Sequence, residues 1–460
     1  MISVPSHRQP LSGNRTIASL FISCCILMLF ACSGSKNSMD RAKVMKPTKR
    51  KALERSGTAM ASKVDTVRWT EIDRTSEYEK SIEELDLDKR GSYNVSLLFP
   101  FDLEQNMMED ANNPKTKLGR MSTYYAGVLL ALEQLEKENI SLNVTTYDAE
   151  SGDFELKLQE CRNADLIIGP RDKGQLSTTA QYGKTNEIPV VSPWLSSTKV
   201  TKDNPYYIQL KPSLRKHMSR MVEHVKANYS DAQVFLLGRN NRKDQSMMRY
   251  VQNVAAAINR SNDARTFQEF YLEEDSLIRG EVAYDSIFYE DRTSVFILPN
   301  WSFVDDEQFV YNAVRKMSGE KGLNDVVLYG MPILLESNRI KFEHYANLNM
   351  KIVRTSFLDK ESPSVKEFRQ AYFNKYQGFP SEESYKGFDM MVFLGRSLHN
   401  YGKNFQYFLD TYESSLYQTE FDIHKVFARS EMQELKDIQY FQNDHLFILE
   451  FTDNHFVPTK

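Results

Sequence analysis

Cysteine is scarce in this chain, which has four in 460 residues. Three of them, Cys24, Cys25 and Cys32, lie near the N-terminus, so only Cys161 belongs to the body of the chain. One cysteine forms no intramolecular disulfide, and a chain of this length buries enough apolar surface to be stable without one. A lone cysteine is more often a small core residue than a nucleophile, so we expect Cys161 to be buried.

Catalytic and metal-binding motifs are also lacking. The sequence contains no glycine-rich phosphate loop, no G-x-S-x-G elbow, no H-E-x-x-H and no cysteine pair with zinc spacing. His217 and His224 lie seven residues apart on one face of a predicted helix, and we expect them to be surface polar residues rather than metal ligands. A hydrolase would need a nucleophile with a base in reach, which no motif supplies. We therefore expect a binding protein without a cofactor or metal, and not an enzyme.

Long apolar runs are absent after the N-terminus. Residues 17–30 are apolar apart from two serines, and the residues before them include Arg8 and Arg15 but no acid. A basic start followed by a short apolar core is typical of a secretory signal. The core is shorter than the roughly 20 apolar residues of a membrane span. Residues 1–31 are therefore predicted to be a signal peptide.

The end of this signal points to a lipid anchor. The segment Leu-Phe-Ala before Cys32, followed by Ser-Gly-Ser, resembles the lipobox of bacterial lipoproteins. The resemblance implies cleavage before Cys32 and a diacylglycerol on its thiol. The chain would then be anchored to a membrane of the cell envelope and face the periplasm or the exterior. The alternative is an ordinary signal or membrane anchor with an incidental cysteine.

The segment that follows is polar and carries its charges in blocks. Residues 41–55 contain seven lysines or arginines and one acid, whereas residues 71–88 are mainly acidic. Such a segment buries too little apolar area to offset the loss of chain entropy, so residues 32–92 are predicted to be a flexible tether. The basic block is expected to be solvated rather than bound to lipid headgroups. Residues 64–69 alternate in polarity and are expected to form a short edge strand.

From Tyr93 onward, compact apolar runs alternate with helical patterns. Alternation of this kind implies right-handed crossovers and parallel sheets, and two such sets follow one another without a change in composition. The predicted fold class is therefore α/β, with two Rossmann-like lobes. Expected strands are 95–101, 142–147, 164–168 and 188–192 in the first set, and 234–237, 295–298, 326–329 and 352–353 in the second.

Candidate binding residues lie in the loops that follow these strands, because open α/β sheets bind ligands at the carboxyl ends of their strands. An aromatic ring facing hydroxyl groups across a cleft suits a small polar solute. Two of these loops contain a tryptophan, Trp194 in one and Trp301 in the other. The alternative that both rings pack inside their own lobes stays open. The candidate residues are Arg171 and Lys173 after the third strand, Trp194, Ser196 and Ser197 after the fourth, and Asn300 and Trp301 in the second set.

Several segments together resemble the type I periplasmic-binding superfamily, especially the leucine/isoleucine/valine-binding proteins. They are residues 127–135 (GVLLALEQL), 167–170 (IIGP), 188–193 (IPVVSP), 368–380 (FRQAYFNKYQGFP) and 387–389 (GFD). The resemblance covers the chain from Tyr93 to the C-terminus.

This resemblance implies two lobes with parallel central sheets, joined by three crossings near residues 211, 356 and 425. Lobe 1 would comprise residues 93–211 and 356–425. Lobe 2 would comprise residues 212–355 and 426–460.

The resemblance also implies a partly altered ligand site. Ser196 matches a ligand-binding hydroxyl, and Trp301 matches an aromatic of the second lobe. Lys173 stands where a serine would hold the ligand carboxylate, and the acid for the ligand ammonium is replaced around residues 331–332. Because a buried α-amino acid needs both charges met, the implied ligand is a small polar molecule, either amino-acid-like or derived from the envelope.

Residues 329–332 (YGMP), 348–349 and 440–451 are similar to a branch of envelope lipoproteins that often carry LysM peptidoglycan-binding repeats. The predicted function is thus a lipid-anchored solute-binding protein, as in amino acid transport. The alternative is a ligand-free scaffold or regulator of peptidoglycan or envelope assembly that acts through protein contacts. Expected partners are a small molecule, the membrane that holds the lipid, and a transporter or envelope-assembly protein. The net charge of −4 gives no reason to expect nucleic acid.

Overall fold

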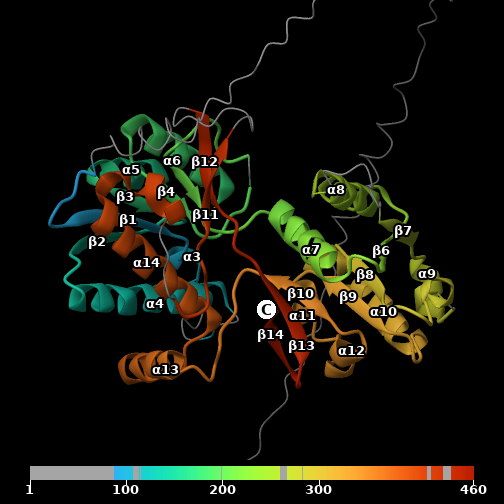
Figure 1. The fold of residues 1–460 in the computed structure, drawn as a ribbon. Coiled ribbons are helices and arrows are strands. Elements are labelled where there is room, and N and C mark those ends of the chain that lie inside the picture. Colours follow the sequence, from blue (N-terminus) through green and yellow to red (C-terminus); the bar gives the residue numbers. More distant parts are fainter. Residues whose placement is uncertain are drawn as a thin grey trace, which may run out of the picture. The chain divides into compact units, whose positions relative to one another are not determined.

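A computed structural model describes residues 87–106, 113, 116–197, 199–258, 267–281, 283–411, 416–427 and 437–459. These residues form two seven-stranded sheets, here called sheet A and sheet B (Figure 1). Each sheet with its covering helices is a lobe, the first around sheet A and the second around sheet B. Cys32 and the expected edge strand at residues 64–69 lie outside the described residues.

Sheet A has the strand order β11-β12-β5-β4-β3-β1-β2. All its neighbouring strands pair in parallel except β11 and β12, which form an antiparallel pair at one edge. The strands are β1 (Tyr93–Phe99), β2 (Leu142–Asp148), β3 (Leu166–Ile168), β4 (Val190–Ser192), β5 (Tyr207–Gln209), β11 (Ile423–Phe427) and β12 (Ile438–Asn443).

Both faces of sheet A are covered by helices, because successive side chains of its strands point to opposite faces and are buried on both. In β1, Leu97 and Phe99 join the apolar cluster that includes residues of α4 and α14, whereas Leu98 packs on the other face with Leu176 of α6. The helices of this lobe are α3 (Leu103–Asn106), α4 (Lys117–Lys137), α5 (Phe154–Glu160), α6 (Lys173–Asn186), α13 (Pro363–Tyr376) and α14 (Glu382–Tyr401), with 3-10 helices η1 (Cys161–Asn163) and η3 (Gly402–Thr411).

Helices α4 and α14 pack against each other unusually closely (Figure 1). A Cβ atom added at Gly127 of α4 would lie 1.9 Å from the carbonyl oxygen of Ser384. One added at Gly387 of α14 would lie 2.1 Å from the carbonyl oxygen of Tyr124. Glycine is therefore required on both sides of this contact, since any side chain would collide with the facing backbone.

Sheet B has the strand order β14-β13-β10-β9-β8-β6-β7, with β13 antiparallel to both β10 and β14. Its strands are β6 (Gln233–Gly238), β7 (Gln268–Tyr271), β8 (Ser294–Leu298), β9 (Val326–Gly330), β10 (Lys351–Arg354), β13 (Phe447–Thr452) and β14 (His455–Pro458). The helices of the second lobe are α7 (Leu214–Asn228), α8 (Arg242–Ile258), α9 (Glu274–Arg279), α10 (Phe303–Glu320), α11 (Ile333–Glu336) and α12 (Phe342–Asn347), with the 3-10 helix η2 (Asp285–Ile287).

The predicted fold class of two α/β lobes with parallel central sheets is confirmed. The chain passes from sheet A to sheet B between β5 and β6, and returns between β10 and β11. The third crossing was expected near residue 425, which is wrong: β12 still belongs to sheet A, so the crossing lies between Asn443 and Phe447. Parallel pairing with β5 places β12 in the first lobe, and a short strand of mixed polarity does not reveal its partner in the sequence.

The lone cysteine and the histidine pair are both buried. Cys161 is free and buried, as expected for a small core residue. The expectation that His217 and His224 are surface residues is wrong, since both are buried. Nδ1 of His224 lies 2.6 Å from the hydroxyl of Tyr329, and Nδ1–H of His217 donates to the carbonyl of Ser213 at 2.9 Å.

Burial determines the charge of these histidines. It lowers the pKa of His224 to about 4 and also lowers the pKa of His217, so both rings are neutral at pH 7. Within the part of the chain that the structure describes, no cluster of three or more histidine, cysteine or acidic side chains suits a metal ion. Among the same residues, no helix is both long enough and apolar enough to cross a membrane.

Candidate ligand-binding site

A cavity of about 380 Å³ lies at the carboxyl ends of the sheet A strands. Strands β1, β3, β4 and β5 are parallel neighbours, so the loops after them meet along one edge of the sheet. Pro100, Arg171, Trp194 and Lys211 follow these four strands in turn, and all four line the cavity. The sheet therefore gathers residues that lie more than a hundred positions apart.

Helices of the first lobe complete most of the wall, and the second lobe contributes a smaller part. The beginning of α4 supplies Lys117, Arg120, Met121 and Tyr124, and the beginning of α14 supplies Glu383, Lys386 and Met390. The second lobe supplies Pro332 and Glu336 around α11 and Arg354 at the end of β10, and Thr355 and Ser356 follow in the segment that returns to the first lobe.

One wall of the cavity is aromatic. The ring of Trp194 lies 5.3 Å from that of Phe99 and 5.4 Å from that of Tyr124, in tilted and edge-on contacts that favour packing of aromatic rings. Trp194 thus packs within its own lobe and also lines the cavity. Its buried indole N–H has no hydrogen-bond acceptor among the described residues.

The charged side chains on the cavity wall are mostly basic. Positive charge that gathers in a partly enclosed site concentrates the electric field and attracts anions. His217, also on the wall, adds no charge at pH 7 because burial lowers its pKa. The charged residues are Lys117, Arg120, Arg171, Lys211, Arg354 and Lys386 on the basic side, and Glu336 and Glu383 on the acidic side.

Three of these cations already have carboxylate partners. Nζ of Lys117 lies 3.3 Å from Asp102 and also pairs with Glu150, and the hydrogen bond to Glu150 raises the pKa of Lys117. Nζ of Lys386 lies 2.8 Å from a carboxylate oxygen of Glu383. A guanidinium nitrogen of Arg354 lies 3.2 Å from Glu382.

Arg171 and Lys211 differ from these three. No carboxylate of the described chain lies within ion-pair distance of either side chain. The protein around Lys211 lowers its pKa, first by desolvation and then through the nearby charges of Lys386 and Arg171. Glu336 and Glu383 oppose this shift in part, and Lys211 as a residue remains exposed to solvent.

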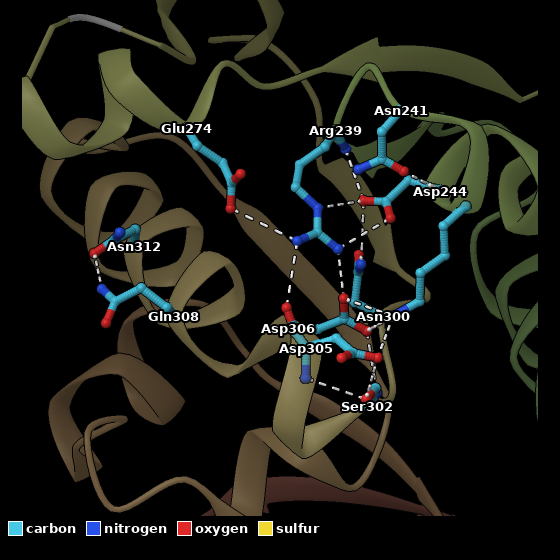
Figure 2. A network of polar contacts seen from close by, with 11 residues as sticks. Arg239, Asn241, Asp244, Glu274, Asn300, Ser302, Asp305, Asp306, Gln308 and Asn312 are labelled. Carbon is cyan, nitrogen blue, oxygen red and sulfur yellow. Dashed lines mark hydrogen bonds and ion pairs between the residues drawn. The ribbon is translucent and has the colours of Figure 1, made fainter. Parts of the chain in front are cut away.

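In the second lobe, a buried ionic network occupies the corresponding strand ends (Figure 2). Arg239, directly after β6, makes two hydrogen bonds to Asp244 at 2.9 and 3.0 Å and pairs with Asp306. Asp244 is 1% exposed and Asp306 is fully buried, so the guanidinium compensates both carboxylates. The side-chain amide of Asn300 donates to Asp244 at 3.2 Å and thereby belongs to this network.

The structure brings only some of the predicted binding residues together. Arg171 and Trp194 line the cavity, and Lys173 lines an adjoining depression that shares Lys117, Arg120 and Arg171 with it. The described lining of the cavity includes neither Ser196 nor Ser197, which are half-buried in the loop after β4. It also includes neither Asn300, whose amide binds Asp244, nor Trp301, whose side chain is 48% exposed.

Sequence reasoning missed the cations outside the predicted loops. Lys211 follows β5, a strand of only three residues that has no recognisable alternation. Lys117 and Lys386 lie at helix beginnings, and only the packing of α4 and α14 places these beginnings at the strand ends. Glu336 lies one helical turn after residues 331–332, where the resemblance implied that the acid for the ligand ammonium is replaced. A search for charged residues just after every short apolar run could have found Lys211.

Comparisons with known proteins agree with this architecture. Residues 93–265 match the family model described as the receptor family ligand binding region. A search of curated proteins gave no significant match to the sequence. A branched-chain amino acid ABC transporter protein from Rhodospirillum rubrum is 11% identical, with a TM-score of 0.55 over 80% of this chain and 100% of that chain. This chain has the type I periplasmic-binding fold.

Two further proteins share the type I periplasmic-binding fold with this chain. One is a branched-chain amino acid ABC transporter periplasmic ligand-binding protein from Burkholderia xenovorans, 11% identical, with a TM-score of 0.50 over 80% of this chain and 94% of that one. The other is an ABC transporter substrate-binding protein from Sphaerobacter thermophilus, also 11% identical, with a TM-score of 0.50 over 80% and 96%. The structural superpositions show the fold, and sequence identities this low leave the ligand open. The family model describes a ligand-binding region, in agreement with a binding protein rather than an enzyme.

Proposed function

We propose that this chain is a lipid-anchored extracytoplasmic solute-binding protein whose two lobes hold a small polar ligand. The observation that carries the proposal is the cavity of about 380 Å³ at the strand ends of sheet A. Its volume falls within the range of small-molecule sites, roughly 300–1,000 Å³, and its wall combines an aromatic surface with charged groups, as such sites do. A transporter or an envelope-assembly protein would receive the loaded form.

A scaffold that acts only through protein contacts has no need of such a cavity. Its cleft would be filled by bulky side chains, because unfilled space forfeits packing contacts. Here Arg171 and Lys211 border open space, where a bound solute would supply their missing partners. Trp194 is proposed to contact the apolar part of the solute, because its ring forms part of the wall.

Solute binding is expected to raise the thermal stability of the purified full-length chain. A ligand present at a hundred times its dissociation constant stabilises the folded state by about 2.7 kcal/mol. The measurement is a thermal-shift screen of neutral and acidic amino acids, dicarboxylates, short peptides and muropeptides. Trp194→Ala should lose most of the response to the solute found, because it removes part of the cavity wall.

Phe379→Ala is the matched control, since this aromatic side chain of the same lobe is 74% exposed and its loss should leave the response intact. If no compound shifts the transition of the wild-type chain, solute binding is refuted and the scaffold function is favoured. An equal response in Trp194→Ala and in the wild-type chain would remove Trp194 from the proposed site.

The lipid anchor is proposed separately, from the lipobox-like segment before Cys32. In a bacterial host supplied with an alkyne-tagged fatty acid, the wild-type chain should acquire the label and fractionate with membranes. Cys32→Ser should lose both the label and the membrane association, because the thiol is the acylation site. Cys161→Ser should be labelled like the wild-type chain, since Cys161 is buried in the folded body. Full labelling of Cys32→Ser would contradict the anchor.

A further inference from the structure

We infer that the solute is a small organic acid with at least two negative charges, whose acidic groups bind Arg171 and Lys211. This inference rests on the proposed solute-binding function and names the chemical class of the ligand. The resemblance to amino acid binders does not predict it, because those proteins meet one carboxylate and one ammonium group.

The first argument is that the unpaired charges of the first-lobe wall are positive. Lys117 and Lys386 have carboxylate partners, at 3.3 Å for Asp102 and 2.8 Å for Glu383. Arg171 and Lys211 have none among the described residues, although both line the same cavity. Both residues are exposed, so water solvates their charges in the free protein, and two anionic groups of a bound solute would replace this water.

The second argument is energetic. Besides desolvation, the charges of Lys386 and Arg171 lower the pKa of Lys211, because they repel its charge. The carboxylates of Glu336 and Glu383 offset this repulsion only in part. A bound dianion would offset this repulsion and favour the charged form of the lysine. The arrangement therefore favours the bound state of an acidic solute over that of a neutral one.

The third argument concerns the body of the ligand. Besides its cations, the cavity is lined by the aromatic residues Trp194 and Tyr124 and by Met121 and Met390. These side chains can pack against the carbon skeleton of an organic acid. An inorganic anion in the same place would lose its hydrating water on the side that faces them. We therefore assign the site to an organic acid rather than to free phosphate.

One acidic side chain distinguishes two kinds of organic acid. Glu336 of α11 lines the cavity, and no lysine or arginine of the described chain lies within ion-pair distance of it. A solute with an amino group as well as two carboxylates would satisfy Glu336 together with Arg171 and Lys211. Glutarate and L-glutamate share two carboxylates and differ in this amino group, so they form a matched pair of probes.

The test is isothermal titration of the purified full-length chain with glutarate, L-glutamate, L-leucine and inorganic phosphate at low ionic strength. Glutarate or L-glutamate is expected to bind, with affinity that falls as sodium chloride is raised from 0.05 to 0.5 M, because salt screens the attraction. L-leucine and phosphate are expected to bind at least tenfold more weakly. Tighter binding of L-glutamate than of glutarate would locate the amino group at Glu336.

Substitutions then identify the groups that hold the acid. Arg171→Gln and Lys211→Met should each weaken binding of the better probe about tenfold to a hundredfold, since each removes a charge-assisted contact. Lys211→Arg keeps the charge and should retain most of the affinity. Lys137→Gln removes the same charge at the far end of α4 and should bind like the wild-type chain. Unchanged circular dichroism and melting of the free variants show that they are folded.

The outcomes separate this inference from the proposed function. Binding of L-leucine or of phosphate without binding of either dicarboxylate overturns the inference and leaves solute binding standing. Equal affinity for dicarboxylates in Arg171→Gln, Lys211→Met and the wild-type chain also overturns it. If none of the four probes binds and the wider thermal-shift screen is negative as well, both proposals fail.

Discussion

Replacing Arg239 with methionine is expected to destabilise the second lobe by about 3–5 kcal/mol, because it leaves two buried carboxylates without a cation. Asp244 is 1% exposed and Asp306 is fully buried, and the guanidinium contacts both. Lys243 also reaches Asp306, at 3.1 Å, but it does not replace the paired hydrogen bonds to Asp244. Urea unfolding followed by circular dichroism measures the loss as a lower midpoint.

Two further substitutions test whether a loss of stability comes from the guanidinium of Arg239. Arg239→Lys keeps the charge but loses the forked geometry of the guanidinium, so its stability should fall between those of the wild-type chain and the methionine variant. Arg279→Ala breaks an exposed pair with Glu281 and should change the midpoint little. A methionine variant that unfolds at the wild-type urea concentration would mean that the network in Figure 2 contributes no stability.

The substitution Gly127→Ala is expected to destabilise the first lobe by about 3 kcal/mol, the upper end of the usual effect of overpacking. The added methyl group would lie 1.9 Å from the carbonyl oxygen of Ser384, so α4 and α14 must separate. Alanine favours a helix over glycine by about 1 kcal/mol, which is too little to offset the collision. Thermal unfolding of the variant should therefore begin at a lower temperature.

Gly319→Ala provides the matched control for this collision. Gly319 is also in a helix, α10, but nothing lies within 4 Å of the position its Cβ would occupy. Its replacement should leave stability unchanged or raise it slightly, because only helix propensity changes. Equal stability of the two variants would contradict the close packing of α4 on α14.

Most secondary structure could be predicted because it depends on local patterns. The buried run of β1 is visible in a few consecutive residues, and the strand forms at Tyr93–Phe99, close to the expected range of 95–101. Strands β5 and β12 were not predicted, because they are only three and six residues long and their mixed polarity shows no clear alternation of apolar and polar residues. The third crossing was misplaced for the same reason, since the partner of β12 decides its lobe.

The candidate binding residues divide in the same way. Arg171 and Trp194 could be predicted, because a residue that follows a parallel strand lies at the ligand edge of the sheet wherever the strand is placed. Asn300 and Trp301 satisfy the same rule, yet Asn300 binds Asp244 and Trp301 projects outward at 48% exposure. Position after a strand selects candidates, and local packing decides which of them face the cavity.

The sequence by itself determined the two α/β lobes and the loops at the strand ends, because strand and helix periods act over short distances along the chain. Only the tertiary structure decided which cations remain without an acid. Lys117 finds Glu150, which lies 33 positions away, whereas Arg171 lies next to Asp172 and does not pair with it. Ion pairing depends on distances in space of a few ångströms, which separation along the chain does not reveal.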